Sequence, residues 1–187
     1  MENILAQALL IFLGGSVCFA QVTSSSSGSA PPNRAEAERA VRAVLYEMSI
    51  ANQSGDAKMF EKCAAHRTLK FYDLLAEELL KNPTIGKPLE LAGVTNGESY
   101  IEFSFRSIAQ RAAAMPRSEI DAFAHKFAAV PLTFLSDTEV NVENKAGTFK
   151  VILEAGEWKV DGTDALRKTL LIILPLNAES KAKLEKI

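Results

Sequence analysis

Residue types that support nucleophilic, metal or acid–base chemistry are few in this chain. Its 187 residues include two cysteines and two histidines. A Cys/His zinc site needs about four such ligands and would have to gather every cysteine and histidine of the chain, so the composition argues against one, and we expect no metal or cofactor. Cys63 falls on the apolar stripe of a predicted helix, where a cysteine is usually a small buried side chain rather than a nucleophile. The sequence also lacks phosphate-loop, dinucleotide-binding, nucleophile-elbow and zinc-protease motifs.

Five further residues are candidates for acid–base chemistry or anion binding. His66 and Asp73 lie seven residues apart on one predicted helix. Two helical turns separate them, which is too far for direct contact. Arg106, Arg111 and Arg117 could neutralise an anion, but a proline before Arg117 is expected to end the helix that would align them. A solvent-exposed face explains these arginines better.

Composition and charge limit the classes of protein to which the chain can belong. Hydrophobic residues make up 48% and charged residues 24%, and the formal net charge is -2. These values are ordinary for one folded domain with its own core. The sequence has no basic patch of the kind that binds nucleic acid or an anionic membrane surface.

Residues 1–20 are predicted to be a secretory signal peptide. Their apolar stretch is short, and Cys18 and Ala20 occupy the −3 and −1 positions of a cleavage site before Gln21. The first three residues carry no Lys or Arg, which is atypical of a signal. Two alternatives stay open: the stretch is a buried or membrane-anchoring helix, or Cys18 is lipidated.

Residues 21–33 are rich in serine and include Pro31-Pro32, so we predict a flexible linker. The mature protein is therefore expected in the periplasm or outside the cell, without a membrane span once the signal is removed.

Four amphipathic helices are predicted next, because apolar residues recur at i, i+3 and i+4. Asn33, Asp56 and Ser118 are the expected N-caps of the first, second and fourth helices. Residues 84–96 are rich in Gly and Pro and are predicted to be a loop with room for a short strand at residues 89–94. The predicted helices span residues 34–52, 57–82, 98–115 and 119–130.

The pattern then changes to strands, predicted at residues 132–135, 139–143, 148–153 and 157–160. Phe149, Val151 and Leu153 alternate along one strand, and Trp158 and Val160 resume the alternation after Ala155-Gly156. This break is typical of a hairpin. All five apolar residues are expected on the face that the helices cover, unless a bulge at the break shifts the register.

Helices followed by a β-meander predict an α+β fold, with N-terminal helices packed on one face of a C-terminal antiparallel sheet. The single domain is expected to span residues 34–176. It includes a short helix at residues 164–174, whose apolar run at 170–174 should dock on the domain rather than meet a membrane. Residues 177–187 are lysine-rich and predicted to be an exposed charged tail.

Two segments of the chain resemble the nuclear transport factor 2-like superfamily, in particular its secreted bacterial members of unknown function. One is the break between the first two helices, Ala51-Asn52-Gln53-Ser54-Gly55-Asp56. The other is Glu154-Ala155-Gly156-Glu157-Trp158-Lys159-Val160-Asp161, which resembles the hairpin that closes the sheet in that family. The resemblance implies a curved antiparallel sheet wrapped on helices around a cone-shaped pocket.

In such a fold the pocket would hold a small, mostly apolar ligand, and the side chains expected to line it are Tyr46, Tyr72, Phe105 and Trp158. Enzymes of the superfamily, such as ketosteroid isomerase, place a Tyr donor and an Asp or His base in the cone. The candidates here for these catalytic roles are Tyr46, His66, Tyr72, Asp73 and His125.

The sequence does not place a base, a donor and an orienting residue together. We therefore expect an exported, non-catalytic binding domain, for which a homodimer is compatible with the sequence. The alternatives are a cone-pocket enzyme of the isomerase or dehydratase type, and a purely structural protein–protein interaction module.

Overall fold

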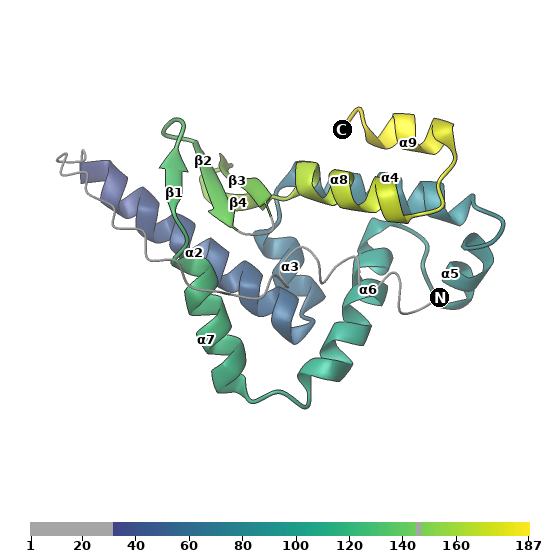
Figure 1. Ribbon diagram of the computed structural model, residues 1–187, viewed down its shortest axis with the longest axis horizontal. Helices are drawn as coiled ribbons and strands as arrows, with labels where there is room; N and C mark the ends of the chain where they lie inside the picture. Colours follow the sequence, from purple (N-terminus) through teal and green to yellow (C-terminus); the bar gives the residue numbers. More distant parts are fainter. Residues whose placement is uncertain (1–31, 145–146) are drawn as a thin grey trace.

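The computed structural model describes residues 32–144 and 147–187 of the chain (Figure 1). The predicted signal peptide and nearly all of the predicted linker lie outside these residues. The described chain is an α+β fold with helices followed by an antiparallel sheet, as predicted. In chain order the elements are α2 (Pro32–Ser54), α3 (Ala57–Cys63), α4 (His66–Leu80), α5 (Gly86–Leu91), α6 (Gly97–Ala112), α7 (Arg117–Ala128), β1 (Leu132–Phe134), β2 (Glu139–Asn144), β3 (Gly147–Glu154), β4 (Glu157–Asp161), α8 (Thr163–Ile173) and α9 (Ala178–Leu184).

The four strands form an antiparallel meander in the order β1-β2-β3-β4. Leu153 lies opposite Trp158 and Val151 opposite Val160, so the β3–β4 hairpin has the predicted register and no bulge. Its two turn residues, Ala155 and Gly156, have φ angles of 50° and 85°. Two positive φ values in a two-residue loop are typical of a type I′ turn, whose twist matches that of the strands.

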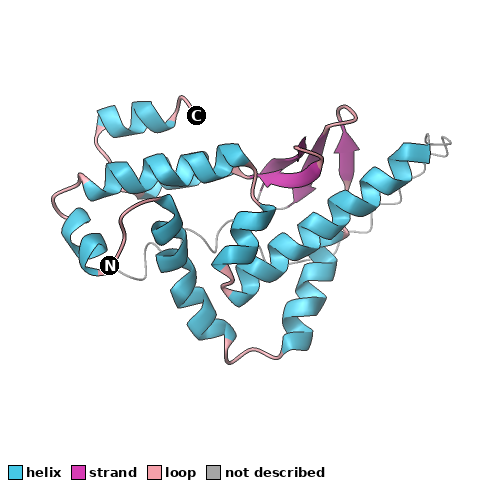
Figure 2. Cartoon of the chain, turned by 180° about the vertical axis from the view of Figure 1, so that it is seen from behind, coloured by secondary structure: helices cyan, strands magenta, loops and turns pink. Residues whose placement is uncertain are grey.

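One face of the sheet packs on the helices. Val140, Val151 and Val160 on this face are at most 2% exposed. The long helix α2 runs alongside the sheet and contacts β4 (Figure 2), and its Val41 and Leu45 are completely buried. The period of two in the strands and the helical period in α2 therefore place their apolar faces against each other, as the sequence predicts. Leu153 is the exception among the five apolar residues expected on the covered face, because it is 36% exposed.

Two of the three expected helix caps are wrong. Helix α2 begins at Pro32, because a proline fits the first helical turn without loss of a hydrogen bond. Asn33 therefore lies inside the helix and is not its N-cap. Helix α7 begins at Arg117 without a side-chain cap, so Ser118 is not its N-cap. Asp56 does cap α3, since its carboxylate accepts a 2.9 Å hydrogen bond from the Met59 amide.

The predicted second helix is two helices, α3 and α4. The chain breaks at Ala64 and Ala65, where the Ala65 amide donates a 2.9 Å hydrogen bond to the carbonyl of Val160 in β4. The Glu154 carboxylate accepts a 3.0 Å bond from the His66 amide at the first residue of α4. Both bonds come from the distant hairpin, so local periodicity could not reveal the break.

The predicted loop at residues 84–96 contains a short helix, α5, and the expected strand within it is wrong. The Asn82 side chain accepts a 3.3 Å bond from the Ile85 amide. At the other end, Gly93 has a φ of 88° and the Val94 amide bonds to the carbonyl of Leu89 at 2.9 Å. A positive-φ glycine with this closing bond is a typical helix terminus.

The C-terminal part of the chain packs on the domain more closely than expected. Leu170 and Leu174 of the apolar run are 3% exposed, which confirms docking, although Ile172 is 82% exposed. Residues 177–187 are not an exposed tail, because Leu184 of α9 is completely buried and α9 lies against α4. No helix in the described ranges is long and apolar enough to cross a membrane.

Candidate functional site

Aromatic side chains from α3, α4 and α6 pack against one another in the core. Tyr72 and Phe105, two of the expected pocket-lining residues, are each 1% exposed. The Phe60 ring lies 5.7 Å from Tyr72 and 5.0 Å from Phe105, centroid to centroid. The cavity beside Phe60 and Tyr72 measures about 20 Å³. That volume holds about one water molecule, whereas small-molecule pockets are usually about 300–1,000 Å³.

Trp158 lies at the rim of the covered face rather than in the interior. It is partly buried and packs against the core, and its ring meets Phe134 edge-on at 6.5 Å. Tyr46 lies elsewhere, in a surface groove between α2 and α7. Within the described residues, the four expected side chains therefore do not share one cavity.

The groove between α2 and α7 brings together two of the acid–base candidates. The Tyr46 hydroxyl donates a hydrogen bond to the Asp121 carboxylate, and the Tyr46 ring lies 4.9 Å from the ring of His125. The His125 Nε2 atom is 3.5 Å from Asp121 Oδ2. Asp121 was not among the candidates. Its spacing of four residues from His125 is readable in the sequence, but its meeting with Tyr46 depends on how α7 packs on α2.

Solvent reaches this Tyr–Asp–His cluster. The side chain of His125 is 70% exposed and that of Asp121 is 51% exposed. The hydrogen bond to Asp121 raises the pKa of Tyr46, which keeps the phenol protonated. Acid–base catalysis gains most where charges act in a site that excludes water. The groove lacks that exclusion, so its geometry suits binding better than proton transfer.

The floor and rim of the groove combine small apolar residues with arginines. Its volume is about 650 Å³, and its lining residues are Arg39, Arg42, Ala43, Tyr46, Glu47, His125, Ala128 and Ala129. Arg42 Nη1 donates to the carbonyls of Ala128 at 2.7 Å and Val130 at 3.3 Å, and this side chain also pairs with Glu38. Arg42 therefore fixes the end of α7 against α2.

The remaining sequence candidates do not line this groove. Asp73 Oδ1 accepts a 3.1 Å bond from the Gly97 amide at the start of α6, while His66 is exposed at the start of α4. Arg106, Arg111 and Arg117 are exposed, as a solvent-exposed face predicts.

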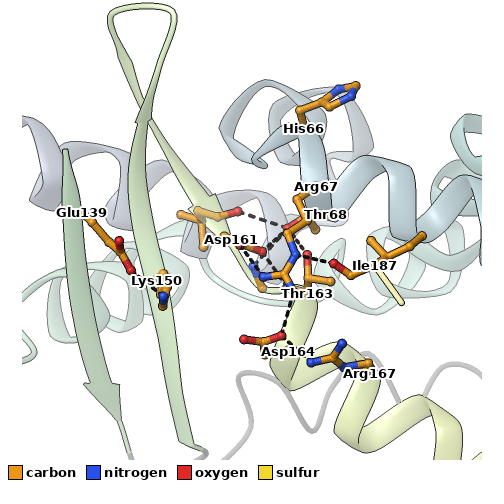
Figure 3. Close-up of polar contacts among 12 residues, drawn as sticks. His66, Arg67, Thr68, Glu139, Lys150, Asp161, Thr163, Asp164, Arg167 and Ile187 are labelled. Carbon is orange, nitrogen blue, oxygen red and sulfur yellow. Dashed lines mark hydrogen bonds and ion pairs between the residues drawn. The ribbon is translucent and has the colours of Figure 1, made fainter. Parts of the chain in front are cut away.

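Figure 3 shows a polar network that joins α4, the end of β4 and the start of α8. Arg67 donates to Asp161 at 3.2 Å, to Asp164 at 3.1 Å and to the main-chain oxygen of Ile187 at 2.7 Å. Asp161 also accepts a 3.0 Å bond from the Thr163 amide. Burial raises the pKa of Asp161, but the hydrogen bonds from Thr163 and the charge of Arg67 outweigh burial, so the net pKa is lowered. With every group paired, this network stabilises the junction rather than forming a site.

A second polar cluster surrounds Glu78 between α4 and α9. The carboxylate is buried and accepts bonds from Ser180 at 2.5 Å, Lys81 at 3.0 Å and Lys183 at 3.3 Å. The hydrogen bond from Ser180 is the main reason that the pKa of Glu78 falls to about 2. An adjoining surface cavity of about 500 Å³ is mainly polar. Sequence reasoning missed this cluster because it treated residues 177–187 as exposed.

Cys63 is the buried side chain that the sequence predicts. It is 1% exposed, and burial, followed by the nearby charge of Glu47, raises its pKa to about 12. No group of three or more His, Cys, Asp or Glu residues in the described ranges is arranged to hold a metal ion. Comparison of the chain with protein-family models, curated proteins and solved structures finds no match.

Proposed function

We propose that this protein is an exported, non-catalytic binding domain and that its ligand binds in the groove between α2 and α7. The observation that carries this proposal is the contrast between two spaces. The interior cavity measures about 20 Å³, whereas the groove measures about 650 Å³. Of these two spaces, the groove has the volume of a small-molecule site, and its lining is mainly apolar, unlike that of the cavity of about 500 Å³ beside Glu78.

The lining of the groove suggests the chemistry of the ligand. Ala43, Ala128 and Ala129 leave room for an apolar body, and the rings of Tyr46 and His125 offer faces for packing. Arg39 also lines the groove, and the described residues give it no hydrogen-bond or ion-pair partner. A small, mostly apolar molecule with one acidic group fits this combination.

Export and superfamily membership are parts of the same proposal. The apolar stretch and serine-rich linker of residues 1–33 support export. A Gly-x-Trp hairpin that ends an antiparallel sheet, with helices on that sheet, supports membership of the nuclear transport factor 2-like superfamily. The proposal moves the ligand from the expected interior pocket to the surface, because Phe60, Tyr72 and Phe105 pack against one another in the core.

An apolar anionic dye, anilinonaphthalene sulfonate, tests the groove directly. We expect saturable binding that Ala43→Glu abolishes, because the new carboxylate enters the groove beside an acidic probe. Ala122→Glu is the matched control, since Ala122 is exposed on α7 but does not line the groove. Equal binding by the two variants would contradict the proposal. If the parent does not bind the dye, the proposal is also contradicted. That result would favour the alternative of a structural protein–protein interaction module, which needs no pocket.

The Tyr46–Asp121–His125 cluster favours a second candidate, an enzyme of the isomerase type. Tyr46→Phe separates the two functions, because it keeps the ring and removes the donor. A binding site retains most of its dye affinity after this change. An isomerase acting on a ketosteroid probe would instead lose turnover by about 10²–10⁴-fold.

A further inference from the structure

Strand β1 is an open edge of the sheet. It ends the strand order, and in the described part of the chain it pairs only with β2 (Figure 1). The opposite edge differs, because the parallel bridge between Ala64 and Val160 partly covers β4. An unpaired edge offers main-chain groups to another strand, and charge, proline, a short strand or a covering element weakens such pairing. Strand β1 has three residues and follows Pro131, whose missing N–H falls on the side that faces β2.

The register identifies which main-chain groups of β1 are unpaired. The Leu135 amide donates a 2.9 Å bond to the Glu139 carbonyl, and Thr133 lies opposite Asn141. In an antiparallel ladder the residues that bond across the pair alternate with residues whose groups point away. Thr133 and Leu135 therefore face β2, and the N–H and C=O groups of Leu132 and Phe134 point outward. No hydrogen bond to these outward groups is found within the described ranges.

We propose that a second copy of this chain pairs with β1 in antiparallel fashion, about a two-fold axis at Thr133. Leu132 then lies opposite Phe134 of the partner subunit, and Phe134 opposite the partner's Leu132. These are the two residues with outward groups, so every such donor meets an acceptor. A C2 contact requires this kind of self-complementarity.

The side chains in this register are also complementary. On the solvent face Thr133 meets the partner's Thr133, and a Thr–Thr pair across strands is favourable. Leu135, which is 52% exposed, meets the partner's Pro131. Residues 131–135 carry no charge, so no like charges oppose each other along the paired strands. The strand is short, so we expect weak, concentration-dependent association.

Cysteine cross-linking tests the register of this pairing. Thr133 faces its own copy at a non-hydrogen-bonded position, where Cα atoms are about 4.5 Å apart, within the range for a disulfide of about 4.4–6.8 Å. We expect oxidised Thr133→Cys to give a covalent dimer. The control is Glu143→Cys, which places the new cysteine at an exposed position on β2 and keeps the native cysteines unchanged. This variant should stay largely monomeric. Equal cross-linking of both variants would overturn the proposed register.

A charge exchange at the same residue tests the interface without a covalent bond. By sedimentation equilibrium of the full chain, Thr133→Lys should raise the dimer dissociation constant by about tenfold or more, because like charges then lie opposite each other. Mixing the Thr133→Lys and Thr133→Glu variants should restore dimers, and Glu143→Lys should behave as the parent. A parent chain that stays monomeric at about 1 mM, or a dimer that Thr133→Lys leaves unchanged, would overturn the proposal.

Discussion

Replacement of Phe105 by Ala tests whether the interior of this domain is packed or is a ligand pocket. The Phe105 side chain is 1% exposed, and its ring lies 5.0 Å from that of Phe60. In a packed core the truncation loses transfer free energy and leaves a cavity that the surroundings only partly fill. In a pocket the same change mainly enlarges an existing space.

The expected cost follows from this burial. Phe→Ala in a packed core costs about 3–5 kcal/mol, out of a total free energy of unfolding of roughly 5–15 kcal/mol. With an m value of about 2 kcal/mol per molar urea, the unfolding midpoint of Phe105→Ala should fall by about 2 M. The new apolar cavity should also bind benzene, which would raise the midpoint of the variant and leave the parent unchanged.

Phe103→Ala is the matched control, because Phe103 lies in the same helix and only partly buries its ring against the core. Its midpoint should fall clearly less. If Phe105→Ala costs under about 1 kcal/mol, or if benzene raises the midpoints of the parent and of Ala43→Glu alike, the interior is not filled and the ligand site belongs there.

Four further predictions concern the buried Glu78 and Cys63, the partly buried Trp158 and its neighbour Lys159. The pKa of Glu78 is about 2 in the folded chain, below its ordinary value of 4.5, so its ionised form stabilises the fold above about pH 4.5, and this stability is lost as the pH falls toward 2. Urea unfolding between pH 6 and pH 2.5 should therefore show a smaller loss of stability for Glu78→Gln than for the parent. The Cys63 thiol, with a pKa of about 12, should resist iodoacetamide at pH 8 until urea unfolds the chain, as read on the Cys63 peptide by mass spectrometry. Trp158→Ala should cost about 1–3 kcal/mol in urea, less than Phe105→Ala, because Trp158 is only partly buried. Lys159→Ala should cost about 0.5–1.5 kcal/mol, because the Lys159 ammonium donates a 2.7 Å bond to the Lys62 carbonyl.

The β-meander was readable from the sequence because its signals are local. Alternating residues from Phe149 to Val160 fixed the strands and their covered face, and Ala155-Gly156 fixed the turn between them. The amphipathic period likewise located most helices.

Other features depend on contacts between distant segments. The break at Ala64 and Ala65 follows from bonds to the hairpin. The docking of α9 follows from Leu184 and from Glu78, a buried acid that reads as a surface residue in the sequence. The candidate groove also depends on distant contacts, since Tyr46 and Asp121 lie 75 residues apart in the sequence, on two different helices. A helical period shows which face is apolar, but it does not show which helix will cover that face.

Native mass spectrometry of the protein purified from its own host tests the central claim most directly. We expect the parent to carry a small molecule of defined mass, which the Ala122→Glu variant retains and the Ala43→Glu variant lacks. This result would place a physiological ligand in the groove between α2 and α7. A parent without any bound molecule, or a ligand that Ala43→Glu still retains, would contradict the account.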